Sequence, residues 1–213
     1  MTRDWHAWHR QYDDPESSLS LRLEEVRLQL ATVLEQASGP LRLLSLCAGD
    51  GRDTIPVVAG SERSVSVILV ERDEQLASRA HADAERAGID VDVRTADAGR
   101  SGGWSDRLPV DVVMLCGIFG NISDADVERT VRAARSMLAP GGVVIWTRGS
   151  AVPDDPTHQR GDPAKWVRGL FVRAGFEEVA YVAPHHAAYR VGVARLVQPS
   201  DEPLPDRLFS FLH

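Results

Sequence analysis

The sequence is poor in cysteine and has no long apolar run. Its two cysteines, Cys47 and Cys116, lie far apart and offer no ligand spacing for zinc or an iron–sulfur cluster, so we expect no metal site. No apolar stretch approaches the roughly 20 residues that span a bilayer, and the first residues are charged and aromatic, unlike a secretory signal. These absences predict a cytoplasmic protein with reduced thiols and no membrane partner.

Basic residues are outnumbered by acidic ones, 24 to 31. The formal net charge is −7, and the basic residues are scattered rather than run together. A surface that neutralises phosphates needs clustered positive charge, so nucleic acid is a disfavoured partner. The 213 residues suffice for one domain with a buried core and are few for two. These features give no indication of the oligomeric state.

From residue 41 onward, short apolar runs alternate with helix-length amphipathic segments. This alternation is typical of an α/β protein, in which a parallel sheet has helices on both faces. The apolar runs predict strands at 43–47, 65–71, 91–96, 110–116 and 143–147. Capping and breaking residues predict helices from Asp73 to Gly88, from Ser123 to Pro140 and from Asp162 to Gly175.

Two further features complete the predicted fold. Residues 176–182 and 189–196 are strand-like runs whose link is too short for a parallel crossover, so they must pair antiparallel. A helix is expected over about 15–37, with one apolar face formed by Leu19, Leu23, Val26, Leu30 and Val33. The chain thus divides into a helical segment at 1–38, an α/β core at 39–197 and a tail at 198–213, which is a polar linker followed by a short apolar run.

A buried strand turns through two glycines into a helix at Leu43-Leu44-Ser45-Leu46-Cys47-Ala48-Gly49-Asp50-Gly51-Arg52-Asp53. Glycines let backbone amides approach a ligand closely, and an open helix N-terminus favours a negative group. Glu71 ends the second strand, where a carboxylate can accept both hydroxyls of a ribose, and Asp97 follows the third, within reach of an adenine amino group. Each acid alone is slightly better explained as a solvated strand end. Together with the glycine turn they favour a nucleoside site.

This constellation resembles the class I S-adenosylmethionine-dependent methyltransferases. The family's first motif is commonly an acid, a hydrophobe and Gly-x-Gly-x-Gly, and Leu138-Ala139-Pro140-Gly141-Gly142-Val143 resembles its approach to the fifth strand. The resemblance implies a doubly wound, Rossmann-like sheet of seven strands, five parallel and then an antiparallel hairpin. It also implies S-adenosylmethionine as cofactor, held by Ser45, Cys47, Ala48, Gly49, Asp50, Gly51, Glu71, Arg72, Asp97, Ala98, Cys116, Gly117 and Ile118.

Two positions depart from the family pattern. Ser45 stands where the family has an acid that helps to hold the cofactor's amino-acid end, so Asp50, Arg52 or backbone groups are expected to hold that end instead. Cys47 stands at the first glycine, which is acceptable if the position keeps strand geometry, because only a positive φ demands glycine.

The segment after the fourth strand, Cys116-Gly117-Ile118-Phe119-Gly120-Asn121, is expected between cofactor and substrate. It lacks the Asn/Asp-Pro-Pro-aromatic motif of enzymes that methylate amino groups of DNA bases. Enzymes that methylate cytosine at C5 use a cysteine nucleophile that follows a proline. Cys116 follows a leucine, so we interpret it as a structural thiol. Asn121 either orients a substrate or caps the following turn.

The first twelve residues place Trp5, Trp8, His9 and Tyr12 at helical spacing. Such a segment either folds over the cofactor as a lid or packs on the core. His9, Tyr12 and His158 are the candidate general bases, which are needed only if the methyl acceptor is protonated.

The predicted function is transfer of a methyl group, by in-line displacement, to a nitrogen or oxygen of a small molecule. The protein's main tasks would be to align the two reactants and to exclude water. Three alternatives stay open: a cofactor-binding regulator or partner subunit without catalysis, an RNA methyltransferase, and a nicotinamide-dependent oxidoreductase.

Overall fold

A seven-stranded sheet forms the centre of the protein in the computed structural model, which describes residues 12, 14–149, 162–185 and 187–212. The strand order is β3-β2-β1-β4-β5-β7-β6. The strands are β1 (Leu41–Leu46), β2 (Val65–Glu71), β3 (Val91–Thr95), β4 (Val110–Leu115), β5 (Leu138–Gly149), β6 (Phe176–Val182) and β7 (Tyr189–Leu196). Strands β1 to β5 run parallel, and β7 lies antiparallel between β5 and β6. The predicted doubly wound sheet with its terminal hairpin is confirmed.

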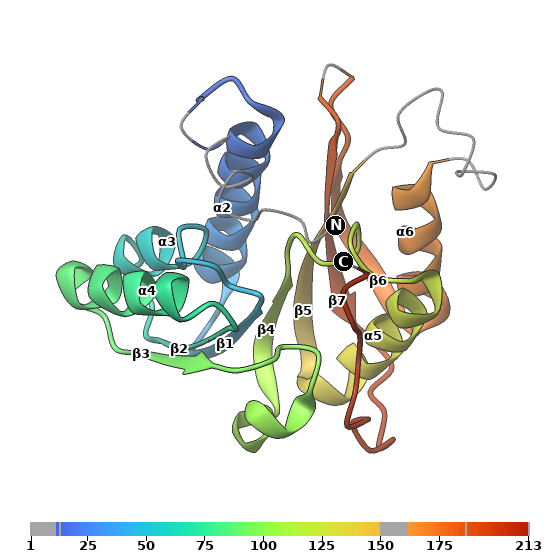
Figure 1. Ribbon diagram of the computed structural model, residues 1–213. Helices are drawn as coiled ribbons and strands as arrows, with labels where there is room; N and C mark the ends of the chain where they lie inside the picture. Colours follow the sequence, from blue (N-terminus) through green and yellow to red (C-terminus); the bar gives the residue numbers. More distant parts are fainter. Residues whose placement is uncertain (1–11, 13, 150–161, 186, 213) are drawn as a thin grey trace.

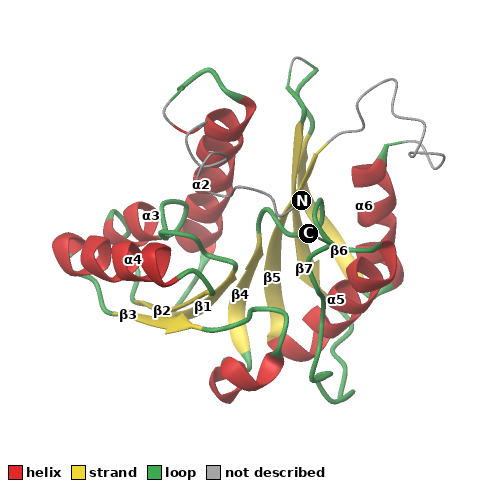
Figure 2. Ribbon diagram, viewed as in Figure 1, coloured by secondary structure: helices red, strands yellow, loops and turns green. Residues whose placement is uncertain are grey.

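Helices cover both faces of this sheet (Figures 1 and 2). They are α2 (Ser18–Gln36), α3 (Ile55–Ala59), α4 (Glu74–Ala87), α5 (Asp124–Met137) and α6 (Pro163–Arg173). Side chains of α2, α3 and α4 share one buried cluster with one face of the strands, and side chains of α5 and α6 share a second cluster with the other face. On the second face, the rings of Trp146 and Phe171 stack with centroids 5.7 Å apart.

Three helices begin at the capping residues that the sequence predicted. Asp73 accepts from the backbone N–H of Gln75 and Leu76, Ser123 from Asp126, and Asp162 from Ala164. Each cap satisfies an amide that has no partner within its helix and contributes about 1 kcal/mol. Helix α4 also ends as predicted, at Gly88 with a φ of 70°.

The buried side of α2 differs in part from the predicted face. Leu19, Val26 and Leu30 are buried as expected, but Leu34 is buried in place of Val33, and Leu23 is half-buried. The packing partner explains the difference, because α2 lies against β7 and β5 and buries positions spaced by four, 26, 30 and 34. In α6, Val167 is fully buried and Trp166 is half-buried.

The C-terminal tail packs into the core more closely than a linker would. Leu208 and Phe209 are 0% and 1% exposed and join the cluster of α5 and α6. The backbone N–H of Leu208 donates to the Gly99 carbonyl at 2.8 Å, and that of Leu212 donates to the Asn121 carbonyl at 3.0 Å. The tail therefore connects the segment after β3 to the segment after β4. None of the described helices has the length and hydropathy to cross a membrane.

Candidate functional site

The candidate site lies where the strand order reverses. β1 pairs with β2 on one side and with β4 on the other, so the chain leaves β1 and β4 on opposite sides of a topological switch point. In open α/β sheets, ligands bind beyond the carboxyl ends of the strands at this point. The glycine turn, Glu71, Asp97 and Cys116 all follow or end strands at this edge.

The turn after β1 has a left-handed backbone at three positions. Cys47, Gly49 and Gly51 have φ values of 57°, 59° and 72°. The expectation that Cys47 keeps strand geometry is wrong, because β1 ends at Leu46 and the chain turns one residue earlier than predicted. A non-glycine residue in this conformation is strained by about 1–2 kcal/mol. Gly51 is required for a second reason, since a Cβ there would lie 2.6 Å from Ile55 Cδ1.

Glu71 fastens this turn to the end of β2. Its Oε2 accepts from the backbone N–H of Gly49 at 2.8 Å, and its Oε1 accepts from those of Arg72 and Asp73, each at 2.8 Å. A carboxylate has about four lone-pair positions, so these three bonds leave one of them, on Oε2, for a further donor. Glu71 thus orients the glycine turn as well as offering an acceptor.

Asp97 is held from two directions. Its Oδ1 accepts from the backbone N–H of Gly99 at 3.0 Å, and its Oδ2 lies 3.5 Å from Nη1 of Arg207 in the tail. Burial raises the pKa of the Cys47 thiol, and the negative charges of Glu71 and Asp97 raise that pKa further. The ends of β1, β2 and β3 therefore converge as the sequence predicted.

Helix α2 holds the other side of the turn. Arg27 donates from Nε and Nη2 to the Arg52 carbonyl at 2.9 and 2.7 Å. Arg52 forms a two-point ion pair with Asp50 and lies over the ring of Tyr12, 4.4 Å from its centroid. Arg22 donates to the Tyr12 hydroxyl at 2.9 Å. The predicted residues Asp50, Arg52 and Tyr12 are thus brought together, and sequence reasoning missed Arg22 and Arg27 because helix polar faces usually carry arginine.

Three ionisable groups near α2 have raised pKa values. Burial raises the pKa of Tyr12, partly offset by Arg22, so this hydroxyl is protonated at neutral pH. Burial also raises the pKa of Asp53, although the hydroxyl of Thr54 donates to its Oδ1 at 3.0 Å and Arg22 favours its charged form. The pKa of the Cys116 thiol is raised by burial and by Asp53. These groups line the side of the site toward α2.

The segment after β4 is fixed by two polar side chains. Thr147 of β5 accepts from the Gly117 backbone N–H at 2.8 Å, and the Asn121 amide donates to the Gly117 carbonyl at 2.7 Å. Asn121 therefore closes the turn that precedes it, and its two predicted roles, orienting a substrate or capping the following turn, stay predictions. Ile118 is fully buried and has only its backbone to offer a ligand.

The remaining predicted residues fall into three groups. Ser45, Ala48 and Ala98 are buried next to the turn, and Arg72 is exposed at the end of β2. Trp5, Trp8, His9 and His158 lie outside the described residues. Within the described residues, no group of three or more potential metal ligands occurs.

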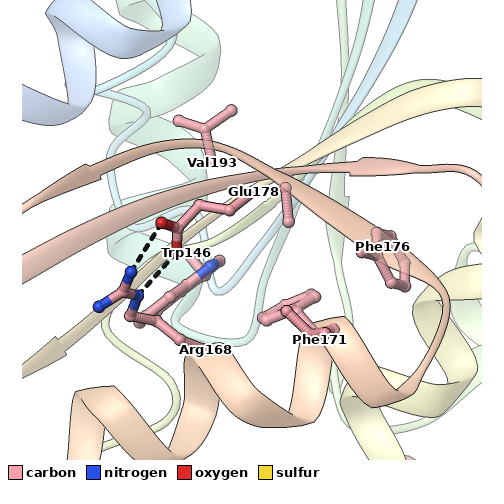
Figure 3. A pocket seen from close by; sticks show the side chains of 8 residues that line it. Trp146, Arg168, Phe171, Phe176, Glu178 and Val193 are labelled. Atoms are coloured by element: carbon pink, nitrogen blue, oxygen red, sulfur yellow. Dashed lines mark hydrogen bonds and ion pairs between the residues drawn. The ribbon is translucent and has the colours of Figure 1, made fainter.

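A small hollow lies elsewhere, between α6 and the strands β5, β7 and β6 (Figure 3). Trp146, Phe171 and Phe176 line it, and the two-point ion pair of Arg168 with Glu178, at 2.6 and 2.7 Å, closes one side. None of its lining residues belongs to the glycine turn or the strand-end acids. We therefore interpret it as a packing feature of α6.

Comparisons with known proteins agree with this geometry. A family profile described as "Methyltransferase domain" matches residues 43–142. The ribosomal RNA small subunit methyltransferase B of Enterobacter sp. (strain 638) is 27% identical over 150 residues, which are 60% of this chain and 34% of that protein. This chain thus spans about a third of that relative's length.

Two solved structures illustrate the similarity in fold. The N-methyltransferase NodS from Bradyrhizobium japonicum WM9 is 18% identical with a TM-score of 0.59, covering 89% of this chain and 99% of its own. The 1,6-didemethyltoxoflavin-N1-methyltransferase of Burkholderia thailandensis, solved with its substrate and S-adenosylhomocysteine, is 20% identical with a TM-score of 0.64, covering 91% and 84%. Residues 43–142 thus match a methyltransferase domain, and the strand order 3-2-1-4-5-7-6 is that of the class I methyltransferase fold.

Proposed function

We propose that this chain methylates a nitrogen or oxygen atom of a small molecule at the carboxyl ends of β1 and β4. The observation that carries the proposal is the convergence of the glycine turn, Glu71 and Asp97 beside the fixed segment 116–121. The ends of β1, β2 and β3 carry the groups that suit a nucleoside, and the segment after β4 is proposed to lie beside the methyl acceptor.

The residues present fit S-adenosylmethionine. The positive φ values of Gly49 and Gly51 turn the backbone without a Cβ in the way, and Glu71 keeps one acceptor position for a ribose hydroxyl. Asp97, which follows β3, is proposed to accept from the adenine amino group. Because Ser45 is only 2% exposed, we propose that the amino-acid end is held by backbone groups of the turn together with the Asp50–Arg52 pair and Arg22.

The bound cofactor supplies a methyl group that its sulfonium already activates for in-line displacement. The protein's own contribution is then alignment and exclusion of water. Thr147 and Asn121 fix the acceptor-side segment through Gly117, and Tyr12 lies against Arg52 over the turn. A protonated Tyr12 can donate a hydrogen bond to an acceptor but does not begin as a general base, so His9 and His158 stay the candidates for that role.

A small molecule suits this chain better than RNA. The net charge of −7 gives no field to attract a polyanion, and the two structural neighbours described above have small-molecule or N-methyltransferase names. The ribosomal RNA relative supports RNA as the second candidate acceptor.

Calorimetric titration and a methyl-transfer assay test the proposal. S-Adenosylhomocysteine should bind and NADH should not, which separates this site from a nicotinamide site. Transfer of labelled methyl should then occur to members of a panel of small amines and phenols and not to ribosomal RNA transcripts. Tight cofactor binding without transfer to any acceptor would instead favour a regulator or partner subunit, and transfer to RNA alone would favour the second candidate.

A further inference from the structure

Two arginines lie opposite each other at the carboxyl end of β5. Arg148 of β5 pairs in register with Arg190 of β7, so their side chains leave the same face of the sheet. Like charges directly across a strand pair repel and destabilise the pair. An arrangement of this kind calls for a negative group nearby.

Arg148 lacks such a group among the residues that the structure describes. No hydrogen bond to its guanidinium and no ion pair occurs within the described ranges, and its interactions with Asp124 and Asp162 act only at a distance. Partial burial lowers the pKa of Arg148, as expected for a cation that has lost water without gaining a close partner. A half-buried arginine without a close acid is uncommon, because burying a charge is costly unless it is paired.

Arg190 is held beside it by backbone carbonyls and forms one long ion pair, with Asp162. Its Nη1 donates to the carbonyls of Tyr189 and Ala187 at 2.7 and 3.0 Å, while its buried Nε has no acceptor in the described part of the chain. The nearest carboxylate, Asp162, is 3.8 Å from that Nε and already accepts from the N–H of Ala164 at 2.9 Å. Asp162 thus lies near Arg190 and acts on Arg148 only at longer range.

The location connects this pair to the acceptor side of the site. A Cβ at Gly120 would lie 3.2 Å from Nη1 of Arg148, so the guanidinium packs on the segment that follows β4. Thr147, the neighbour of Arg148 in β5, fixes the same segment through Gly117. The two acids that act on Arg148 lie at the starts of helices on this side: Asp124 is the first residue of α5, and Asp162 caps α6.

We propose that Arg148, with Arg190 behind it, binds a carboxylate group of the methyl acceptor, so that the substrate is an acidic small molecule. A carboxylate is planar and carries two oxygens and one charge, which matches the two-pronged edge of a single guanidinium. It also offsets the repulsion between the two arginines. That the bound carboxylate belongs to a methyl acceptor rests on the proposed function. Binding of a carboxylate at Arg148 can be tested without any methyl transfer.

The test uses the full chain labelled with ¹⁵N in arginine and glycine and saturated with S-adenosylhomocysteine. Benzoate, benzamide and inorganic phosphate are titrated at constant ionic strength, and the Arg148 Nε and Gly120 amide signals are followed by NMR. Benzoate and benzamide have nearly the same shape and differ in charge. We expect a saturable shift with benzoate, none with benzamide and a weaker response to phosphate.

Three variants locate the effect. Arg148→Gln should weaken benzoate binding, read at Gly120, by about tenfold or more, the loss expected for a charge-assisted hydrogen bond. The benzoate affinity of Arg148→Lys should lie between those of Arg148→Gln and the parent protein. Lysine keeps the positive charge but lacks the two-pronged edge of the guanidinium. Arg168→Gln is the matched control, since Arg168 is already paired with Glu178, and it should leave benzoate binding unchanged.

The outcomes separate this inference from the proposed function. Equal shifts with benzoate and benzamide, an unchanged benzoate response in Arg148→Gln, or no saturable response to benzoate would overturn the carboxylate site. A stronger response to phosphate would overturn the choice of a carboxylate. Failure of S-adenosylhomocysteine to bind the parent protein would instead contradict the proposed function, and the titrations would then be read on the cofactor-free chain.

Discussion

The backbone N–H of Gly49 donates a hydrogen bond of 2.8 Å to Oε2 of Glu71, joining the turn after β1 to the end of β2. The side chain predicted to hold a ribose therefore also shapes the loop around it. A change at Glu71 acts on the cofactor both directly and through the position of Gly49.

Replacement of Glu71 by alanine is expected to weaken S-adenosylhomocysteine binding by about 1–3 kcal/mol, because hydroxyls and amides lose a charged acceptor. Glu71→Gln should also weaken binding, since an amide cannot accept from three N–H groups at once. Isothermal calorimetry measures both. Glu74→Ala, at an exposed position of α4, is the control, and equal affinities in all four proteins would remove Glu71 from the ribose site.

Cys47→Gly should be more stable than Cys47→Ala by roughly 1 kcal/mol, because both lose the thiol and only glycine relieves the left-handed backbone. Urea unfolding of the two variants isolates the backbone strain from the loss of side-chain packing. If the alanine variant is as stable as the glycine variant, the backbone at Cys47 is not strained.

Phe209→Ala should destabilise the protein by about 3–5 kcal/mol, since the ring is 1% exposed and its loss leaves a cavity. The cofactor affinity of the folded fraction should fall as well, because the tail connects the segments after β3 and β4. Leu212→Ala changes a side chain that is 57% exposed and should alter stability by less than about 1 kcal/mol. A small effect of Phe209→Ala would mean that the tail is dispensable for the core.

Asp53 is expected to lower stability at neutral pH. Burial raises its pKa, so the folded state keeps the proton to a higher pH than the unfolded chain, whose value is about 3.9. The folded protein therefore loses stability as the pH rises between these two values, and the deficit persists above them. Asp53→Asn should raise the melting temperature at pH 7, with the difference shrinking below about pH 4.

Melting curves over this pH range, with Asp201→Asn at an exposed position as control, measure the Asp53 effect. A lower melting temperature for Asp53→Asn at neutral pH would show that attraction to Arg22 outweighs the cost of burial.

Both cysteines should react slowly in the folded protein and completely once it is unfolded. Burial raises the pKa of each thiol, so little thiolate is present at pH 8. Mass spectrometry after iodoacetamide treatment should show two modified cysteines under denaturing conditions and mostly none under native conditions. Fewer than two in the denatured sample would mean that a thiol is already oxidised or blocked.

Several features were predictable from local sequence because they depend on neighbours along the chain. Asp73, Ser123 and Asp162 cap helices through amides two or three residues away, and the alternation of apolar runs defines the parallel strands. The antiparallel hairpin follows from a link too short to cross over. Glu71 and Asp97 come together because parallel strands bring their carboxyl ends to one edge.

Other features depend on contacts between distant parts of the chain, which a local pattern does not encode. The conformation of Cys47 is set by where β1 leaves the sheet, and the burial of Leu34 by the strands under α2. Arg207 reaches Asp97 across 110 positions of sequence, and Arg148 meets Arg190 only because β7 inserts between β5 and β6. Residue types and periodicity thus determined the strands, the caps and the acids that follow β2 and β3, whereas tertiary packing alone decided which charges lie together at the end of β5, because electrostatic partners there are chosen by strand order and not by spacing.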